Sequence, residues 1–374
     1  MMASTFPDSI SSRSGSVTHS RDQVAGRSDD HSQLDFNTSP NNMETKREHP
    51  RFSFFSWLKL NVVDLVTMAL MGALGLGLYL SPPAPSRSFA VNNPSGDVVY
   101  PQFAYPVRKE IVPIWAAALI AFLVPFFFIS LFQARRRSFE DFLYTNMGVL
   151  KSLITAAVFQ VFIKTLIGGL RPHFLAVCKP VVPLTGAQTG VGFQGMYYDR
   201  SVCTGDKDEI DDSLESMPSG HSTAAFAGLV FLSLYINAQL KVMSAHNPPY
   251  WSMCLFFAPI LGATLIAGAM TIDAYHHWYD VLAGAVIGTF TAFVAFRQTF
   301  ASVWDFRYNH LLLPRGGATF FEYGWSADAR SADLPFTRRG GWGIGAREAM
   351  NGAPFDASAL VGGGSASGMR GRVH

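Results

Sequence analysis

The sequence predicts an all-α membrane protein, a six-transmembrane-helix bundle flanked by two disordered tails. Of its 374 residues, 49% are hydrophobic and only 15% are charged, whereas soluble domains carry about 25% charged residues. The apolar residues are concentrated within 51–300, where six stretches reach the length of about 18 to 20 residues that a helix needs to cross the hydrocarbon core. A formal net charge of +2 provides no polycationic surface, so nucleic acid is excluded as an expected partner.

The chain divides into three regions by composition. Residues 1–50 lack apolar periodicity and cannot bury enough surface to offset the entropy of ordering, so we expect a disordered cytoplasmic tail. This segment is not a signal peptide, because the first apolar stretch follows Lys46, Arg47 and Arg51. Residues 51–300 form the predicted membrane domain, and 301–374 form a Gly- and Arg-rich cytoplasmic tail.

The six predicted spans are 61–80, 111–132, 146–168, 222–240, 251–271 and 278–300. Short cytoplasmic connections are enriched in Lys and Arg. Arg135, Arg136 and Arg137 directly follow the second span, and a second basic cluster precedes the first. Both chain ends are therefore expected in the cytoplasm, and the connections 81–110, 169–221 and 272–280 on the opposite, non-cytoplasmic face.

Three cysteines are too few for a disulfide scaffold. Cys178 and Cys203 share the longest non-cytoplasmic connection and could pair in an oxidising lumen, but spacing alone leaves the pairing open. Cys254 lies within the fifth span and is expected to pack there.

Three short motifs carry polar or charged residues at span ends. They are KTLIGGLRP with Lys164 and Arg171, PSGH with Ser219, Gly220 and His221, and HHWYD with His276 and Asp280. Each has an ordinary interpretation: a lysine that reaches the headgroups, a helix N-cap with a glycine turn, and an interfacial polar cluster. The predicted topology nevertheless places all three on the same face, where a Pro-Ser-Gly turn that opens a helix suits an anion.

Together, these motifs resemble those of the type 2 phosphatidic acid phosphatases, or lipid phosphate phosphatases, within the superfamily that includes the vanadium haloperoxidases. The resemblance covers roughly 55–300 and indicates a fungal-type member. It implies a phosphatidic acid phosphatase/haloperoxidase-like core that hydrolyses phospholipid monoesters in the bilayer. It also implies a phosphohistidine intermediate and no metal or other cofactor, and the sequence shows no convincing carboxylate cluster for a metal at these motifs.

The resemblance also assigns a role to each motif residue. His276 would be the nucleophile, Asp280 would orient its ring, and His221 would act as general acid and then base. Positive charge and backbone N–H groups would hold the phosphate, since phosphoryl transfer depends on positioning and charge stabilisation. These phosphate-binding residues are Lys164, Arg171, Ser219 and Gly220.

One departure from the family pattern concerns the third motif, which in the family begins with a Ser-Arg pair. Here Ala269 and Met270 occupy those positions. Loss of one donor to a transition-state oxyanion typically lowers the rate by about 10²- to 10³-fold. Candidate replacements for the missing arginine are Arg200, Lys179, Lys207 and His277.

The longest connection also contains an acidic run shortly before PSGH. Charge runs are usually solvated faces, so a solvated loop is the favoured interpretation, with a gating or cation-binding role left open. The run comprises Asp206, Asp208, Glu209, Asp211, Asp212 and Glu215.

The function expected from these observations is a lipid phosphate phosphatase active on the non-cytoplasmic side of an endomembrane (ER, Golgi or vacuole) or of the plasma membrane. A lipid phosphoryl or head-group transferase of the same superfamily is the alternative enzyme. A low-activity, non-catalytic relative is a further alternative, favoured by Met270, and a transporter is a weaker one. The preferred lipid and the oligomeric state stay open.

Overall fold

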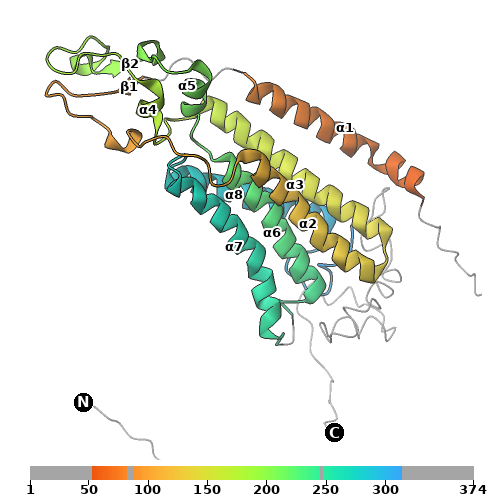
Figure 1. Cartoon of the computed structure of the whole chain (residues 1–374). Coiled ribbons are helices and arrows are strands. Elements are labelled where there is room, and N and C mark those ends of the chain that lie inside the picture. Colours follow the sequence, from red (N-terminus) through yellow and green to blue (C-terminus); the bar gives the residue numbers. More distant parts are fainter. Residues whose placement is uncertain (1–52, 82–87, 245–246, 314–374) are drawn as a thin grey trace, which may run out of the picture. The chain divides into compact units, whose positions relative to one another are not determined.

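A computed structural model describes residues 53–81, 88–244 and 247–313. The predicted tail at 1–50 lies outside these residues, as do 314–374 of the second tail. Within the described residues, six helices are long and apolar enough to cross a membrane, which confirms the predicted fold class. They are α1 (Phe54–Tyr79), α2 (Ile114–Arg136), α3 (Phe139–Leu166), α6 (Gly220–Leu240), α7 (Tyr250–Ile272) and α8 (Trp278–Thr299) (Figure 1).

Polar residues mark where several of these helices begin and end. Ser138 accepts a hydrogen bond from the backbone N–H of Asp141 at 3.3 Å and so caps the start of α3. The last turn of α2 carries Arg135 and Arg136, where positive charge complements the helix dipole. The next residue, Arg137, has a φ of 58° and terminates the helix in the left-handed conformation.

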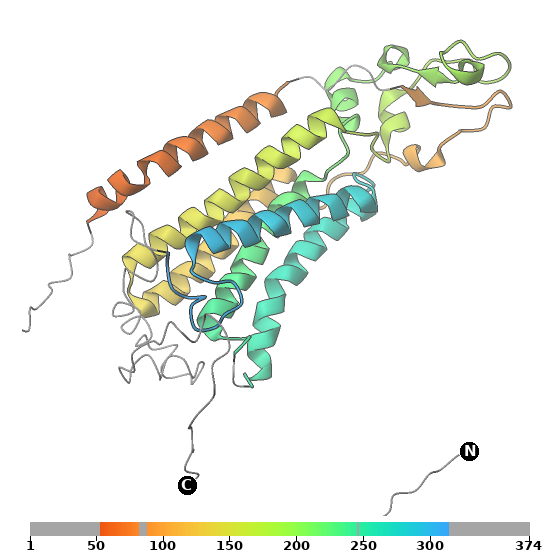
Figure 2. The same cartoon turned by 180° about the vertical axis from the view of Figure 1, so that it is seen from behind.

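The central helix of the bundle is α6, which packs against α2, α3, α7 and α8, whereas α1 lies at the periphery against α3 (Figures 1 and 2). Glycines allow the closest approaches. A β carbon at Gly228 would overlap the carbonyl oxygen of Ala121 in α2, and one at Gly284 of α8 would lie 2.6 Å from the carbonyl oxygen of Ser219. Small residues of this kind let membrane helices approach closely, so the starts of α6 and α8 lie side by side.

Many large apolar side chains are exposed on the surface of the six helices, as expected for helices that face lipid. Cys254 belongs to this surface, because the structure places it exposed on α7. The expectation that it packs inside the protein was therefore wrong. Periodicity could not place it, since α7 is apolar on all sides and carries no polar stripe that would mark its outer face.

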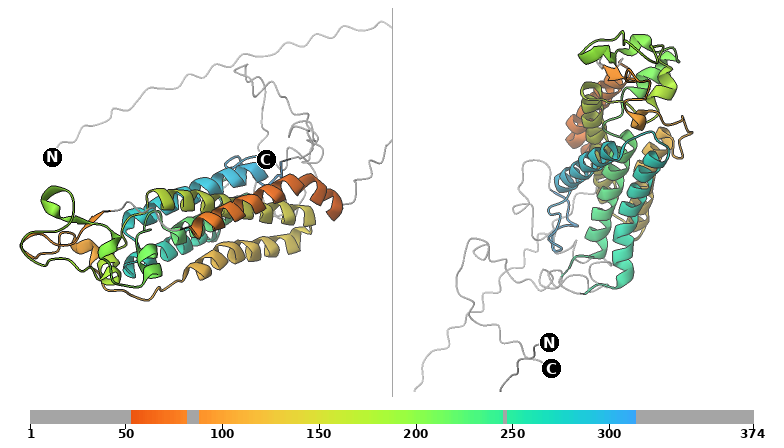
Figure 3. Two further views of the ribbon diagram at one scale, coloured as in Figure 1. Left: turned by 90° about the horizontal axis from the view of Figure 1, so that it is seen from above. Right: turned by 90° about the vertical axis from the view of Figure 1, so that its left-hand side faces the viewer.

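A cap at one end of the bundle is built from 88–110 and 169–217 (Figures 1 and 3). Its core contains Phe89, Phe174, Tyr198, Ile210 and Leu214. A disulfide joins Cys178 to Cys203, which settles the pairing that spacing left open. The cap elements are β1 (Phe89–Ala90) paired antiparallel with β2 (Tyr197–Tyr198), α4 (Phe174–Cys178), α5 (Lys207–Ser213), and the short 3-10 turns η1 (Pro101–Phe103), η2 (Phe193–Gly195) and η3 (Arg200–Val202).

At the other end of the bundle, residues 301–313 pack back on the helices. The N–H of Ala301 donates to Leu311 at 2.9 Å, and the Nζ of Lys241 donates to Asn309 at 2.6 Å. The first residues assigned to the C-terminal tail are thus part of the packed structure.

Candidate active site

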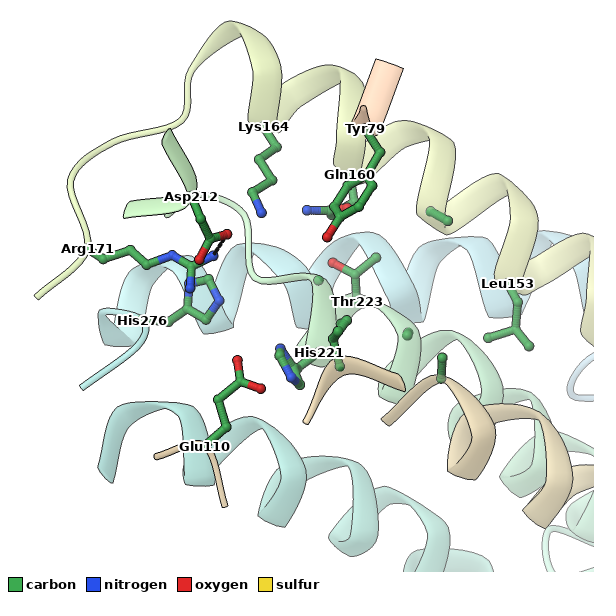
Figure 4. Close-up of a pocket in the computed structure, with 15 residues that line it drawn as sticks. Tyr79, Glu110, Leu153, Gln160, Lys164, Arg171, Asp212, His221, Thr223 and His276 are labelled. Carbon is green, nitrogen blue, oxygen red and sulfur yellow. Dashed lines mark hydrogen bonds and ion pairs between the residues drawn. The ribbon is translucent and has the colours of Figure 1, made fainter. Parts of the chain in front are cut away.

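A cavity of about 400 Å³ opens at the cap end of the bundle, where the three motifs meet (Figure 4). Five of the predicted site residues line it together: Lys164, Arg171, Gly220, His221 and His276. The remaining two, Ser219 and Asp280, do not line the cavity but are fully buried next to residues that do. Sequence-distant motifs therefore converge as the predicted topology required.

Backbone pairing within the cap brings the first motif to the second. The N–H of Gly169 donates to Leu214 at 3.1 Å, and the N–H of Arg171 donates to Ser213 at 2.9 Å. Farther along, the N–H of Met217 donates to Gly168 at 2.9 Å. The chain that leaves α3 thus runs beside the chain that enters α6, which holds Arg171 close to the PSGH turn.

The PSGH turn forms the start of α6. Ser219 is the N-cap residue, and its own N–H donates to the carbonyl oxygen of Asp280 at 3.0 Å, which ties the second motif to the third. Gly220 and His221 occupy the first turn of the helix and line the cavity. The first N–H groups of a helix have no partner within it and carry the positive end of its dipole, so this end can bind an anion.

His276 sits in the link between α7 and α8 and is 4% exposed. Its Nδ1 lies 3.8 Å from Oδ2 of Asp280, which is longer than a hydrogen bond. That oxygen instead accepts hydrogen bonds from Ser216 at 2.5 Å and from the N–H of His277 at 3.0 Å. Among the described residues, Nδ1 of His276 and Oδ1 of Asp280 have no hydrogen-bond partner. Catalytic contacts are often long in unliganded sites and tighten with substrate.

The adjacent histidine, His277, has a different environment. Its ring stacks on Tyr279 with ring centres 4.9 Å apart, packs against Phe103, and does not line the cavity. With Asp280 it forms a capping box at the start of α8. The structure therefore separates the two histidines: His276 faces the cavity and His277 supports the helix start.

His221 and His276 face one another within the cavity, with ring centres 6.4 Å apart. Burial lowers the pKa of His276 to about 4; the Asp280 carboxylate opposes this effect, and the charges of Arg171 and Lys164 add to it. The imidazole is consequently neutral at physiological pH and has a free electron pair, as a nucleophile requires.

The two predicted phosphate-binding cations, Arg171 and Lys164, each lie close to a carboxylate from the acidic run. Arg171 Nη2 lies 2.6 Å from Oδ1 of Asp212, and Lys164 Nζ lies 3.7 Å from Oε2 of Glu215. The run is therefore not a uniformly solvated face: Asp212 is exposed, as a solvated loop predicts, but pairs with Arg171, whereas Glu215 is half-buried beside Lys164. No pattern in the sequence distinguished them from their neighbours.

The position of the missing third-motif arginine is apolar. Met270 is fully buried, and its carbonyl oxygen accepts the N–H of His276 at 3.1 Å. None of the four candidate replacements lines the cavity, and Arg200 instead pairs with Asp211 at 2.6 Å. Lys164 and Arg171 are thus the only Lys or Arg side chains that line the cavity in the described part of the chain.

Four further polar lining residues were missed from the sequence: Tyr79, Glu110, Gln160 and Thr223. Gln160 precedes Lys164 by four residues, so the shared helix face was a usable signal. Its side-chain amide donates to the carbonyl oxygen of Pro218 at 3.1 Å. Tyr79 and Glu110 lie outside the motifs, and only the tertiary structure brings them to the cavity wall. In the described residues, no group of three or more His, Cys, Asp or Glu side chains is arranged to hold a metal ion.

Comparison with known proteins identifies the family. Residues 145–304 match the PAP2 superfamily. The chain is 32% identical to lipid phosphate phosphatase 2 of Arabidopsis thaliana over 210 residues, covering 56% of this chain and 69% of that one. It is 30% identical to diacylglycerol pyrophosphate phosphatase 1 of Saccharomyces cerevisiae over 249 residues, covering 66% and 82%.

A PA-phosphatase related-family protein of Dictyostelium discoideum is 31% identical over 268 residues, covering 70% of each chain. No solved structure matches the chain. The six apolar helices and these relatives identify a multi-pass membrane protein. The chain belongs to the PAP2 superfamily and is a phosphatase of its lipid phosphate phosphatase family.

Proposed function

We propose that this protein hydrolyses the phosphate monoester of a membrane lipid of the phosphatidic acid class. The observation that carries the proposal is the cavity itself, which has a charged end and an apolar end. From Lys164 the lining continues along α3 to Leu153, a distance of about 16 Å at the helical rise per residue. Ile114 and three alanines, Ala118, Ala157 and Ala224, complete the apolar part. A phosphate at the charged end would leave an acyl chain directed into the hydrocarbon.

The chemistry begins with the neutral imidazole of His276. Its Nε2 attacks phosphorus, the phosphorus–oxygen bond to the lipid breaks, and His221 donates a proton to the departing lipid oxygen. Asp280 stabilises the proton on Nδ1 of the resulting phosphohistidine. A water molecule then attacks phosphorus while His221 takes up its proton, which releases inorganic phosphate and restores both histidines.

Positive charge stabilises the phosphoryl oxygens during both steps. Lys164, Arg171 and the first residues of α6, Gly220 and His221, line the same cavity. Fixed donors of this kind act most strongly where charge develops in the transition state. With these charges built into the chain, we expect the reaction to proceed without an added metal ion.

We place the active site on the non-cytoplasmic side of an endomembrane or of the plasma membrane. Two observations support this side. Arg135, Arg136 and Arg137 lie at the opposite end of the bundle from the cap, as expected for the cytoplasmic face. The cap contains the Cys178–Cys203 disulfide, and disulfides persist mainly in oxidising compartments.

The test is phosphate release from phosphatidic acid in detergent micelles with excess EDTA. We expect His276→Ala to abolish release and His277→Ala to retain a measurable rate, because only His276 lines the cavity. Equal rates in the parent and in His276→Ala would overturn the proposed function. Free phosphate as the product supports hydrolysis, whereas a new phospholipid would indicate the head-group transferase.

A further inference from the structure

Among the described residues, Glu110 is the one carboxylate of the cavity wall that lies outside the motifs and outside the acidic run. It precedes α2 in sequence, and its side chain points into the cavity toward His221 and His276 (Figure 4). It therefore faces the space that a phosphoryl group would occupy between the two histidines.

The loop that carries Glu110 is fixed to two of the motif loops. The N–H of Tyr105 donates to Pro172 at 3.0 Å, which ties the loop to the first motif. On the other side, Arg108 donates to the carbonyl oxygen of Ile272 at 3.0 Å, and the N–H of Ile111 donates to Asp273 at 2.8 Å. The position of Glu110 is thus determined by the same loops that position Arg171 and His276.

No ion pair in the described part of the chain includes Glu110. Arg171, a cation of the same cavity wall, pairs instead with Asp212 at 2.6 Å. Burial raises the pKa of Glu110, and the carboxylates of Asp212 and Asp273 add to this effect, while Arg171 and the N–H of Ile114 oppose it. The surroundings therefore favour the neutral acid relative to an exposed glutamate.

A bound phosphate strengthens this preference. Phosphate oxygens and carboxylate oxygens are both hydrogen-bond acceptors, so the two groups can approach closely only when a proton lies between them. The added negative charge of the phosphate also raises the pKa of a neighbouring carboxyl group. An ionised Glu110 would instead repel the substrate.

We propose that Glu110 binds the substrate phosphate as a neutral carboxylic acid, donating its O–H to a phosphate oxygen and so adding a donor to a site whose third motif lacks its arginine. This inference rests on the proposed function. It makes Glu110 a specificity-determining residue: substrate binding weakens as pH rises and Glu110 ionises, so KM rises while kcat changes less.

Other groups in the cavity titrate as well, and the experiment must cancel their effects. The charged and titratable groups around Glu110 are Lys164 of α3, Arg171, Asp212 of α5, His221 of α6, Asp273, Tyr275 and His276. The ratio of kcat/KM between a variant and the parent removes the shared effects of these groups and of substrate ionisation, since both proteins contain the same groups and use the same substrate.

The experiment compares kcat/KM of Glu110→Gln with that of the parent at pH values from about 5 to about 8, on phosphatidic acid. Glutamine keeps an N–H donor but does not ionise. We expect the ratio of the Glu110→Gln variant to the parent to rise with pH by about 10-fold or more, mainly through KM. Glu110→Ala should lose about 10- to 100-fold at the acidic end, the effect of removing a hydrogen bond to a charged group.

Glu140→Gln is the matched control, because Glu140 lies in the first turn of α3, at the other end of the bundle from the cavity. Its ratio to the parent should not vary with pH. The inference would be overturned if the kcat/KM ratio of Glu110→Gln to the parent did not change with pH. Equal losses of kcat/KM in Glu110→Gln and Glu110→Ala at every pH would also overturn it.

A binding measurement separates this inference from the proposed function. Inorganic phosphate should stabilise the parent against thermal unfolding less at high pH than at low pH, while Glu110→Gln should lose this dependence. If phosphate release failed to depend on His276, the proposed function would fall, but phosphate binding would still decide the role of Glu110. The same thermal scans report whether each variant is folded.

Discussion

The guanidinium of Arg171 lies 2.6 Å from the carboxylate of Asp212, so a phosphate that reaches this cation meets a carboxylate already bound to it. Arg171 is buried and lies over the ring of Tyr275, with its Cζ 5.4 Å from the ring centre, whereas the Asp212 side chain is 54% exposed. The arginine is thus the buried partner of this ion pair and the carboxylate the exposed one. A substrate phosphate that binds Nη2 of Arg171 would compete with Asp212 for that donor.

This competition predicts tighter phosphate binding in Asp212→Asn. The change removes the charge and keeps the shape, so the inhibition constant of inorganic phosphate should fall by about 1.5- to 5-fold, as expected for an ion pair with one exposed partner. The constant can be measured through inhibition of diacylglycerol release. Asp208→Asn, an exposed residue of the same helix α5, is the control. An unchanged or larger constant would show that Asp212 does not compete with phosphate.

The buried Met270 predicts a gain of function in Met270→Arg. The carbonyl oxygen of Met270 accepts the N–H of His276, which places the backbone of residue 270 beside the proposed nucleophile. If the lost donor limits the rate, kcat/KM for phosphatidic acid should rise by about 10-fold or more. Met270→Leu, which keeps the position apolar, should leave the rate unchanged. If Met270→Arg is folded but no faster than the parent, the absence of the third-motif arginine does not limit the rate.

The disulfide predicts a stability loss when both cysteines are replaced. It closes a loop with a sequence separation of 25 residues, for which the stabilisation is about 3 kcal/mol. The double variant Cys178→Ser with Cys203→Ser should therefore unfold at a lower temperature under non-reducing conditions. Cys254→Ser on the exposed face of α7 should leave the unfolding temperature unchanged. Equal unfolding temperatures for double variant and parent would contradict a structural role of the bond.

The low pKa of His276 predicts that activity persists into mildly acidic solution. Burial lowers this pKa from 6.5 to about 4 in the ligand-free site, and the proposed nucleophile must be unprotonated. As pH falls, the loss of kcat/KM caused by His276 should therefore begin well below 6.5 and approach half near pH 4. A pH profile of kcat/KM measures this loss, because kcat/KM reports the ionisation of the free enzyme. An acidic limb centred near 6.5 would show that the nucleophile is not the buried imidazole.

Several features of this protein followed from the sequence alone. The six spans were predictable because contact with lipid requires long continuous apolar stretches, which is a local property of the chain. The motif residues Lys164, His221 and His276 were predictable because the three motifs fall at span ends on one predicted face and together resemble those of a known family. The charge of Arg135 to Arg137 likewise predicted which span ends lie together.

Only the tertiary structure decided how the site is completed. Asp212 reaches Arg171 across a separation of 41 residues, and Asp273 fixes the loop of Glu110 across 162. That His277 cannot replace the missing arginine depended on which ring the link turns toward the cavity, and the Cys178–Cys203 pairing depended on the folding of the cap. These outcomes depend on contacts between residues far apart in the sequence. A local pattern of hydropathy or charge cannot specify which carboxylate of the acidic run pairs with Arg171 and which with Lys164.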